Sequence, residues 1–238
     1  MRRIVIATGN PKKVEELRSI LAEAMGEGGP EVLGLADLPG ADRLTEPEEH
    51  HDERGSFEGN ARLKAIGYAA QTDLPCLADD SGLEVDALGG RPGVISSHYS
   101  TGGAETGLHR EERDGANNRK LLEDLKGVPL ERRTARFVCV MALAMPGDPP
   151  QVVLTSRGEF EGRIGLPEAE AGGRMELVVP RGGGGFGYDP LLLLTEPQAG
   201  AGTRTSAELS PEEKNRLSHR GKAARAMVER IGAMLAER

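Results

Sequence analysis

Aromatic residues and cysteines are scarce in this chain. Among 238 residues there is no tryptophan, the aromatic residues make up 3%, and there are two cysteines. Cys76 and Cys139 lie far apart in the sequence, which excludes a disulfide-based scaffold and a cysteine zinc site and favours a reducing compartment. Because neither has a neighbouring histidine that could activate its thiol, we expect both to be core residues.

Long hydrophobic runs are also missing. The opening MRRIVIATGN places two arginines before a short apolar run, which is too short for the hydrophobic segment of a signal peptide. No run approaches the roughly 18 apolar residues of a membrane-spanning helix. We therefore expect a cytoplasmic protein with no membrane contact. No internal repeat is visible, which excludes solenoids and propellers.

The chain has no excess of positive charge. Lys and Arg total 30 against 38 Asp and Glu, so the formal net charge is −8. Because a protein that coats a nucleic acid polymer needs the opposite sign, we expect no such partner, and any anionic ligand requires a local cluster of cations. Hydrophobic residues make up 37%, which is enough for a packed core and predicts one domain spanning residues 1–238.

Short apolar runs alternate with helical periodicity along the chain. Strands are predicted at residues 3–7, 31–35, 75–78, 133–145, 151–164 and 175–179, with 133–145 and 151–164 paired as a hairpin, and residues 191–194 form a short apolar run. Helices are predicted after the N-cap Asn10 with Pro11, at residues 57–71 and 117–125, and after the capping box that begins at Ser210. The faces expected to pack inward are Leu63, Ile66 and Ala70 on the second helix and Met227, Ile231, Met234 and Leu235 on the last. Interleaved strands and helices predict an α/β fold with a mixed sheet.

The segment TGNPKK (residues 8–13) follows the first predicted strand and opens the first predicted helix. Backbone N–H groups at a helix start, the helix dipole and Lys13 together suit a phosphate group. The segment lacks the G-K-[ST] that ends a P-loop. On this segment alone, the alternative that both lysines are simply solvated stays open.

Two adjacent carboxylates, Asp79 and Asp80, follow an apolar strand in LADDSGLEV (residues 77–85). On an extended backbone they point to opposite sides, so one can face a metal while the other anchors a turn. The carboxyl ends of strands are also where α/β proteins place ligands. The alternative is a plain Asp-Ser-Gly β-turn.

A glycine-rich segment, GGGGFGYDP (residues 182–190), carries two of the few aromatic residues, Phe186 and Tyr188. Glycines let a backbone approach a ligand closely, and an aromatic ring beside them can act as a platform on which a base stacks. The alternative is a flexible surface loop.

The segment EKNRLSHRGK (residues 213–222) is rich in residues that can be cationic. Lys214 and Arg220 share a helix face only if the helix breaks near Ser218, which could then cap the final helix. The alternative is an ordinary charged helix surface.

Five segments, in this order, resemble the inosine triphosphate pyrophosphatase family, also called the Ham1-like or non-canonical purine triphosphate pyrophosphatases. The segments are VIATGN at 5–10, FEGNARLKA at 57–65, ADDSGLEVDALGGRPG at 78–93, GFGYDP at 185–190 and TSAELSPEEKNRLSHR at 205–220. The resemblance implies an elongated mixed β-sheet flanked by helices, with two lobes around a central cleft, and a homodimer. It also implies hydrolysis of ITP, dITP and XTP to the monophosphate and pyrophosphate with Mg²⁺, which keeps these nucleotides out of DNA and RNA.

The resemblance also implies roles for individual residues. Asp80 matches the general base and metal-linked carboxylate. For the second metal carboxylate, Glu53 has the matching distance to Gly55 and Asp52 the matching distance to Phe57, so both stay open. The implied substrate-binding residues are Thr8, Gly9, Asn10, Lys12, Lys13, Lys64, Ser81, Phe186, Gly187, Tyr188, Asp189, Lys214, His219 and Arg220.

The chain departs from the family pattern in two segments, residues 102–113 and 165–179, which are longer than usual. We expect both to be surface elaborations in the form of a hairpin or a lid. A chemical hypothesis explains how the base is selected. A hydrogen-bond donor such as Arg220 or a backbone N–H would be satisfied by the oxygen at C6 of hypoxanthine, whereas adenine would place its amino group opposite the same donor. The competing functions are a Maf-like pyrophosphatase for other modified nucleotides and a catalytically silent nucleotide-binding module.

Overall fold

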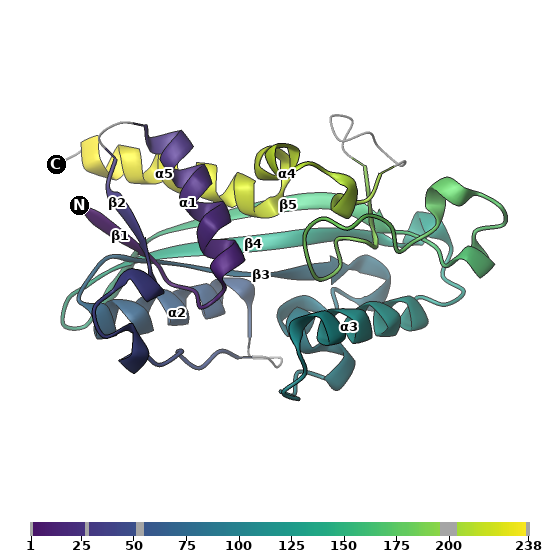
Figure 1. Ribbon diagram of the computed structural model, residues 1–238, viewed down its shortest axis with the longest axis horizontal. Coiled ribbons are helices and arrows are strands. Elements are labelled where there is room, and N and C mark those ends of the chain that lie inside the picture. Colours follow the sequence, from purple (N-terminus) through teal and green to yellow (C-terminus); the bar gives the residue numbers. More distant parts are fainter. Residues whose placement is uncertain (1, 27–28, 51–54, 196–203, 237–238) are drawn as a thin grey trace. The chain divides into compact units, whose positions relative to one another are not determined.

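The computed structural model describes residues 2–26, 29–50, 55–195 and 204–236, shown as ribbons in Figure 1. The strands are β1 (Arg3–Ile6), β2 (Glu31–Gly34), β3 (Cys76–Val85), β4 (Thr134–Met145), β5 (Gln151–Ile164) and β6 (Leu192–Leu194). The helices are α1 (Pro11–Met25), α2 (Phe57–Thr72), α3 (Arg110–Asp124), α4 (Pro211–Leu217) and α5 (His219–Ala236), with short 3₁₀ turns between them.

The six strands form one sheet in the order β2-β1-β3-β4-β5-β6. Strand β1 runs parallel to β2 and β3, whereas β5 and β6 are antiparallel. The predicted α/β class and mixed sheet are confirmed, and so is the pairing of the long strands β4 and β5. The arrangement of two lobes around a cleft stays a prediction.

The chain divides into two compact units. The first unit contains Met1–Ser81, Cys139–Glu159 and Ser218–Arg238, and the second contains Gly82–Val138 and Phe160–Leu217. Each has its own apolar core. The core of the first unit includes Ile4, Ile6, Leu17, Cys139, Met141 and Met227, and that of the second includes Tyr99, Leu121, Phe137, Phe160 and Leu192.

Within the first unit, helices lie on both faces of the sheet. Helices α1 and α5 lie side by side on one face, and α2 covers the other (Figure 1). Both cysteines are buried thiols, as predicted, and burial raises the pKa of Cys76 to about 11. No helix in the described ranges has the length and apolar composition that crossing a membrane requires.

Strand β3 continues past the carboxylate pair. The predicted strand ended at Ala78, just before the carboxylate pair, and an Asp-Ser-Gly turn was one interpretation, but the extended backbone runs on to Val85. Both the predicted strand end and the turn are therefore wrong. The reason is that Leu83 and Val85 enter the core of the second unit, while cations of the first unit contact the buried Asp79 and Asp80.

Helix α3 begins at Arg110 rather than at Asn117. Glu111 and Glu112 occupy its first turn, where the helix dipole favours acidic side chains. The added turns carry charged rather than apolar residues, so hydrophobic periodicity does not detect them. The end of segment 102–113 is therefore the start of a helix and not part of a hairpin or lid.

Two further expectations about local structure are wrong. The predicted strand at 175–179 is a 3₁₀ turn at Met175–Leu177 with a single bridge nearby, so segment 165–179 is not a hairpin either. Helix α2 packs through small residues such as Ala61 and Ala65 together with Tyr68, whereas Leu63 is 37% exposed. Small side chains let the helix approach the sheet closely, which a pattern of larger apolar residues does not reveal.

The last helix buries part of its predicted stripe. Met227 and Ile231 are fully buried, but Leu235 is exposed. The helix does break near Ser218, because α4 ends at Leu217 and α5 begins at His219. Ser218 caps α5 by accepting a hydrogen bond from the Gly221 N–H at 3.1 Å.

Candidate functional site

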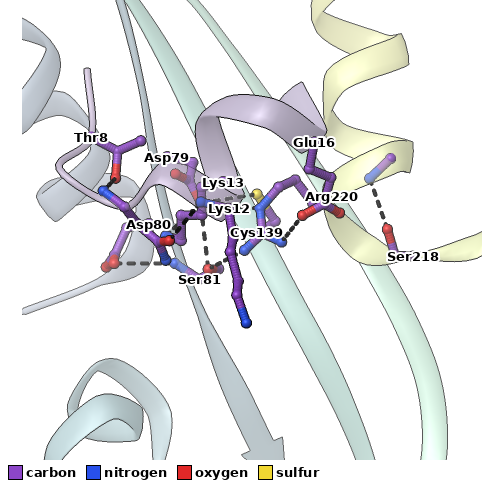
Figure 2. A network of polar contacts seen from close by, with 12 residues as sticks. Thr8, Lys12, Lys13, Glu16, Asp79, Asp80, Ser81, Cys139, Ser218 and Arg220 are labelled. Atoms are coloured by element: carbon purple, nitrogen blue, oxygen red, sulfur yellow. Dashed lines mark hydrogen bonds and ion pairs between the residues drawn. The ribbon is translucent and has the colours of Figure 1, made fainter. Parts of the chain in front are cut away.

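A short turn joins the end of β1 to the start of α1. Asn10 caps α1 by accepting a hydrogen bond from the Lys12 N–H at 3.1 Å, and Pro11 is the first helical residue. The Thr8 hydroxyl accepts a hydrogen bond from the Asn10 N–H at 3.3 Å. Gly9 and Lys12 are exposed, whereas Lys13 turns back toward β3 (Figure 2). The turn therefore places Lys13 beside Asp79 of the carboxylate pair.

Asp79 is the anchor of a buried ionic network in the first unit. Its Oδ2 lies 2.9 Å from Lys13 Nζ and 3.6 Å from Arg220 Nε, and the Ser81 hydroxyl donates a hydrogen bond to it (Figure 2). Burial alone would raise the pKa of Asp79, but the charges of Lys13, Arg220 and Lys64 hold it well below its ordinary value. Asp79 is therefore a firmly ionised carboxylate.

Asp80 points to the opposite side of β3, toward α2, as the alternation of an extended strand requires. Lys64 Nζ lies 3.4 Å from Asp80 Oδ1 and 2.6 Å from Glu49 Oε1. Burial raises the pKa of Asp80 despite the nearby Lys64, and the second oxygen, Oδ2, is buried without a hydrogen-bond partner among the described residues. Asp80 thus has what a general base needs, a raised pKa and an available oxygen.

Lys64 is held between carboxylates. Burial alone would lower the pKa of Lys64, but Asp80, Glu49 and Asp79 raise it above its ordinary value. The lysine is therefore a fixed positive charge in a nearly buried position. Glu49 was not among the predicted site residues, and its loop composition carried no signal for this role.

The break between α4 and α5 places Arg220 in the buried network of the first unit. Its Nη1 lies 2.7 Å from Glu16 Oε2, and its Nη2 donates a hydrogen bond to the Ser81 hydroxyl at 3.2 Å (Figure 2). His219 is buried beside it at the start of α5. Glu16, which lies one turn after Lys13 on α1, was missed by the sequence analysis. The hypothesis that Arg220 reads the base stays a prediction.

The glycine-rich loop of the second unit is organised around Asp189. Its buried carboxylate accepts hydrogen bonds from the Phe186 N–H at 2.8 Å and the Ser206 hydroxyl at 2.7 Å, and Lys214 Nζ lies 2.5 Å away. Gly185 has a φ of +78°, and a Cβ there would overlap Asp189 and Lys214. Only glycine fits this backbone position.

The two aromatic residues of this loop have different surroundings. Tyr188 is buried in the core, and its hydroxyl donates a hydrogen bond to the Ser96 carbonyl at 2.8 Å. The Phe186 ring is only half-buried, and Lys214 Nζ lies 6.0 Å from its centroid. The Tyr188 ring is therefore enclosed in the core, and the Phe186 ring is the one of the two that a ligand could reach. Stacking of a base on an aromatic ring of this loop stays a prediction.

Helix α3 holds this loop through residues spaced four apart. Asp114 accepts a hydrogen bond from the Gly187 N–H at 2.9 Å, and the Asn118 amide donates one to the Gly187 carbonyl at 3.1 Å. One turn earlier, the Arg110 guanidinium lies 4.4 Å from the centroid of the Phe186 ring. These three residues share one helix face. Their spacing is a signal in the sequence, but the predicted helix began at Asn117, after Arg110 and Asp114.

Comparison with known proteins assigns the chain to a family. The sequence profile of the Ham1 family matches residues 4–230. The chain belongs to the Ham1 family. A Nocardia farcinica protein named dITP/XTP pyrophosphatase is 44% identical over 235 residues, which cover 98% of this chain and 97% of that protein. A Nitratidesulfovibrio vulgaris protein of the same name is 46% identical over 226 residues, with 95% and 94% covered.

Solved structures of Ham1 proteins agree with this assignment. The structure of a HAM1 protein from Coxiella burnetii matches with a TM-score of 0.73 and 34% identity, covering 100% of both chains. The family resemblance drawn from the five sequence segments is confirmed.

The Ham1-like pattern implies a magnesium ion, and the described residues fit part of its coordination. Glu53 and Asp52, the two candidates for the second carboxylate, lie outside the described residues. Within the described ranges, no group of three or more His, Cys, Asp or Glu side chains converges on one point. The buried Oδ2 of Asp80 nonetheless has no described hydrogen-bond partner, and carboxylate oxygen is the ligand type that Mg²⁺ prefers. Asp80 therefore fits one ligand position.

Proposed function

We propose that this Ham1-family chain hydrolyses the non-canonical purine triphosphates ITP, dITP and XTP to the monophosphate and pyrophosphate, and so keeps them out of DNA and RNA. The observation that carries the proposal is identity of 44–46% over nearly the whole chain to proteins named dITP/XTP pyrophosphatase. The ionic network around Asp79 and Asp80 supports it, because it combines fixed cations with an available carboxylate.

The triphosphate binds through the first unit. The positive end of the α1 dipole, at the turn of residues 8–13, stabilises phosphate oxygens. Lys12 is exposed and adds a mobile charge, while Lys13, Lys64 and Arg220 are fixed by carboxylates. Catalysis of phosphoryl chemistry is mostly positioning and charge stabilisation, for which fixed charges are well suited.

Asp80 acts on the attacking water. Its Oδ2, which has no hydrogen-bond partner among the described residues, either accepts a proton from the water or would be the metal ligand beside it. In both cases the water oxygen forms a bond to the α-phosphorus, and the bond from that phosphorus to the bridging oxygen breaks to release pyrophosphate. Lys64 holds the other oxygen of Asp80 and so orients the carboxylate. Burial raises the pKa of Asp80, which makes it a better proton acceptor than an exposed aspartate.

We propose Mg²⁺ as the cofactor, held by Asp80 and by Glu53 or Asp52. When bound, it neutralises charge on the phosphate oxygens and organises the triphosphate. Among the described residues, the carboxylates Asp79, Asp80, Glu49 and Glu16 face the cations Lys13, Lys64 and Arg220. Of these carboxylates, Asp80 has an oxygen that no described residue contacts.

On the basis of the family resemblance we propose that the base contacts the loop at residues 182–190. The Phe186 ring provides a stacking surface, Gly187 lets the ligand approach the backbone, and Asp189 with Lys214 holds the loop in shape. Tyr188 contributes by anchoring the loop to the core. On the basis of the family resemblance we also propose a homodimer that works in the cytoplasm, without a nucleic acid polymer or membrane as partner.

The test is pyrophosphate release from ITP, dITP, XTP, GTP, ATP and dTTP, each with Mg²⁺ and with EDTA. We expect metal-dependent release with a strong preference for ITP, dITP and XTP. Asp80→Asn is the matched control for contaminating phosphatases. Release spread evenly over the other triphosphates would favour a Maf-like enzyme, and no release from the folded protein would favour a silent binding module.

A further inference from the structure

Arg110 contacts the proposed base-binding loop from outside the glycine-rich segment. It lies at the start of α3, and its guanidinium is 4.4 Å from the centroid of the Phe186 ring. The side chain is 38% exposed, so it is accessible to a ligand at the ring. It also belongs to the segment 102–113 that departs from the family pattern. This segment therefore brings a cation to the surface on which the base stacks.

The charge of Arg110 is only weakly compensated. Its nearest carboxylate is Asp114, whose Oδ2 lies 3.9 Å from Arg110 Nε. That same oxygen accepts the hydrogen bond from the Gly187 N–H at 2.9 Å. Among the described residues, the Arg110 guanidinium donates no hydrogen bond, and its Nε is buried without a partner.

Lys214, the other described cation near the ring, differs from Arg110 in having a close carboxylate partner. Its Nζ lies 2.5 Å from the Asp189 carboxylate and 6.0 Å from the Phe186 centroid. Its charge is therefore balanced by a buried partner. Of the two described cations at the Phe186 ring, Arg110 is therefore the nearer and the less compensated.

The proposed substrates differ in the charge of the base. Xanthine, with oxygens at C2 and C6, loses a ring proton near neutral pH, whereas hypoxanthine stays neutral there. The triphosphate groups of XTP and ITP are the same, so a cation at the base changes only the preference for one nucleotide over the other. A purine stacked on Phe186 lies within about 8 Å of the guanidinium, where one unit charge in a partly solvated site changes affinity by about fivefold.

We propose that Arg110 is a specificity-determining residue that favours XTP over ITP by acting on the anionic xanthine base. This inference rests on the proposed function, because it assumes that the chain hydrolyses both nucleotides. It assigns a role to the start of α3 that differs from holding the loop, which Asp114 and Asn118 perform.

The test compares kcat/KM for XTP and ITP in wild type, Arg110→Gln and Arg110→Lys, at a pH where only xanthine is ionised. Arg119→Gln is the matched control, because Arg119 is an exposed arginine on the same helix. We expect Arg110→Gln to lower the XTP/ITP ratio about fivefold, mainly through KM for XTP. Arg110→Lys should retain most of the ratio, and Arg119→Gln should leave it unchanged.

Two results would overturn the inference while leaving the proposed function intact: an unchanged XTP/ITP ratio in Arg110→Gln, or an equal loss for both substrates. Pyrophosphate release from neither nucleotide by the wild type would instead overturn the proposed function, and this inference with it. If Arg110→Gln does not fold, the wild type still gives a test. Its XTP/ITP ratio should fall as salt is raised, because screening weakens the extra attraction of the base, and a constant ratio would contradict the inference.

Discussion

Asp79 and Asp80 are neighbours on one strand, yet replacing each by asparagine should affect a different property of the protein, stability in one case and activity in the other. The ionised form of Asp79 is stabilised in the folded protein, because Lys13 and Arg220 contact its carboxylate and hold its pKa low. The ionised form of Asp80 is destabilised, because burial raises its pKa. We therefore expect Asp79→Asn to destabilise the fold, and Asp80→Asn to leave the fold intact while removing activity.

The expected loss of stability follows from the contacts. Removing one partner of a buried ion pair costs about 3–5 kcal/mol when the remaining charge is left uncompensated. In Asp79→Asn, Arg220 keeps Glu16 at 2.7 Å, and Lys13 is 16% exposed and can reach water. We therefore expect the lower end, about 3 kcal/mol, or roughly 6–12 °C in melting temperature for a chain of this size.

Asp80→Asn should change stability by less than about 1 kcal/mol, because it removes a charge that is costly to bury while Lys64 keeps Glu49 at 2.6 Å. Its turnover should fall by about a hundredfold or more, the usual effect of losing a general base.

Thermal unfolding and pyrophosphate release from ITP, measured on both variants, test this contrast. The dependence of stability on pH in the acid range adds a second readout. Because the folded pKa of Asp79 lies below the unfolded value of about 3.9, its contribution is present above that pH and is lost as the pH falls through the folded pKa. Asp79→Asn should therefore flatten the acid limb of the stability profile. Equal melting temperatures for the two variants, or near wild-type turnover in Asp80→Asn, would refute the reasoning.

Three further variants test other parts of the fold. Gly185→Ala forces a side chain onto a left-handed backbone and against Asp189, so KM for ITP should rise about tenfold in steady-state kinetics; an unchanged KM would mean that the loop shape does not matter for binding. Tyr188→Phe loses a hydrogen bond to the Ser96 carbonyl and should lower stability by about 1 kcal/mol with little change in KM; a clear rise in KM would place this ring at the base. Arg133→Lys cannot keep all four contacts of the buried guanidinium, so urea unfolding should show a loss of about 3 kcal/mol, and an unshifted midpoint would contradict that role.

Much of the local structure could be predicted because its causes are local. Asn10 and Pro11 define the start of α1 by short-range hydrogen bonding and a fixed backbone angle. The capping box at Ser210 is formed as predicted, with reciprocal hydrogen bonds to Glu213 at 2.9 and 3.2 Å. The long strands β4 and β5 follow from continuous apolar patterning. Helix α3 was placed too late because its first turns face outward or contact the loop through polar groups, which hydrophobic periodicity does not report.

The sequence by itself determined the family, the α/β class and most of the residues expected at the site, because each depends on short segments whose order can be read directly. Only the tertiary structure decided which groups each of the two carboxylates contacts. Lys13 and Asp79 are 66 positions apart, and Arg220 and Glu16 are 204 apart, so no local pattern records these pairs. Burial and alternation along β3 then separate two adjacent aspartates into a paired anchor and an available base. In the same way, folding brings Arg110 to the Phe186 ring.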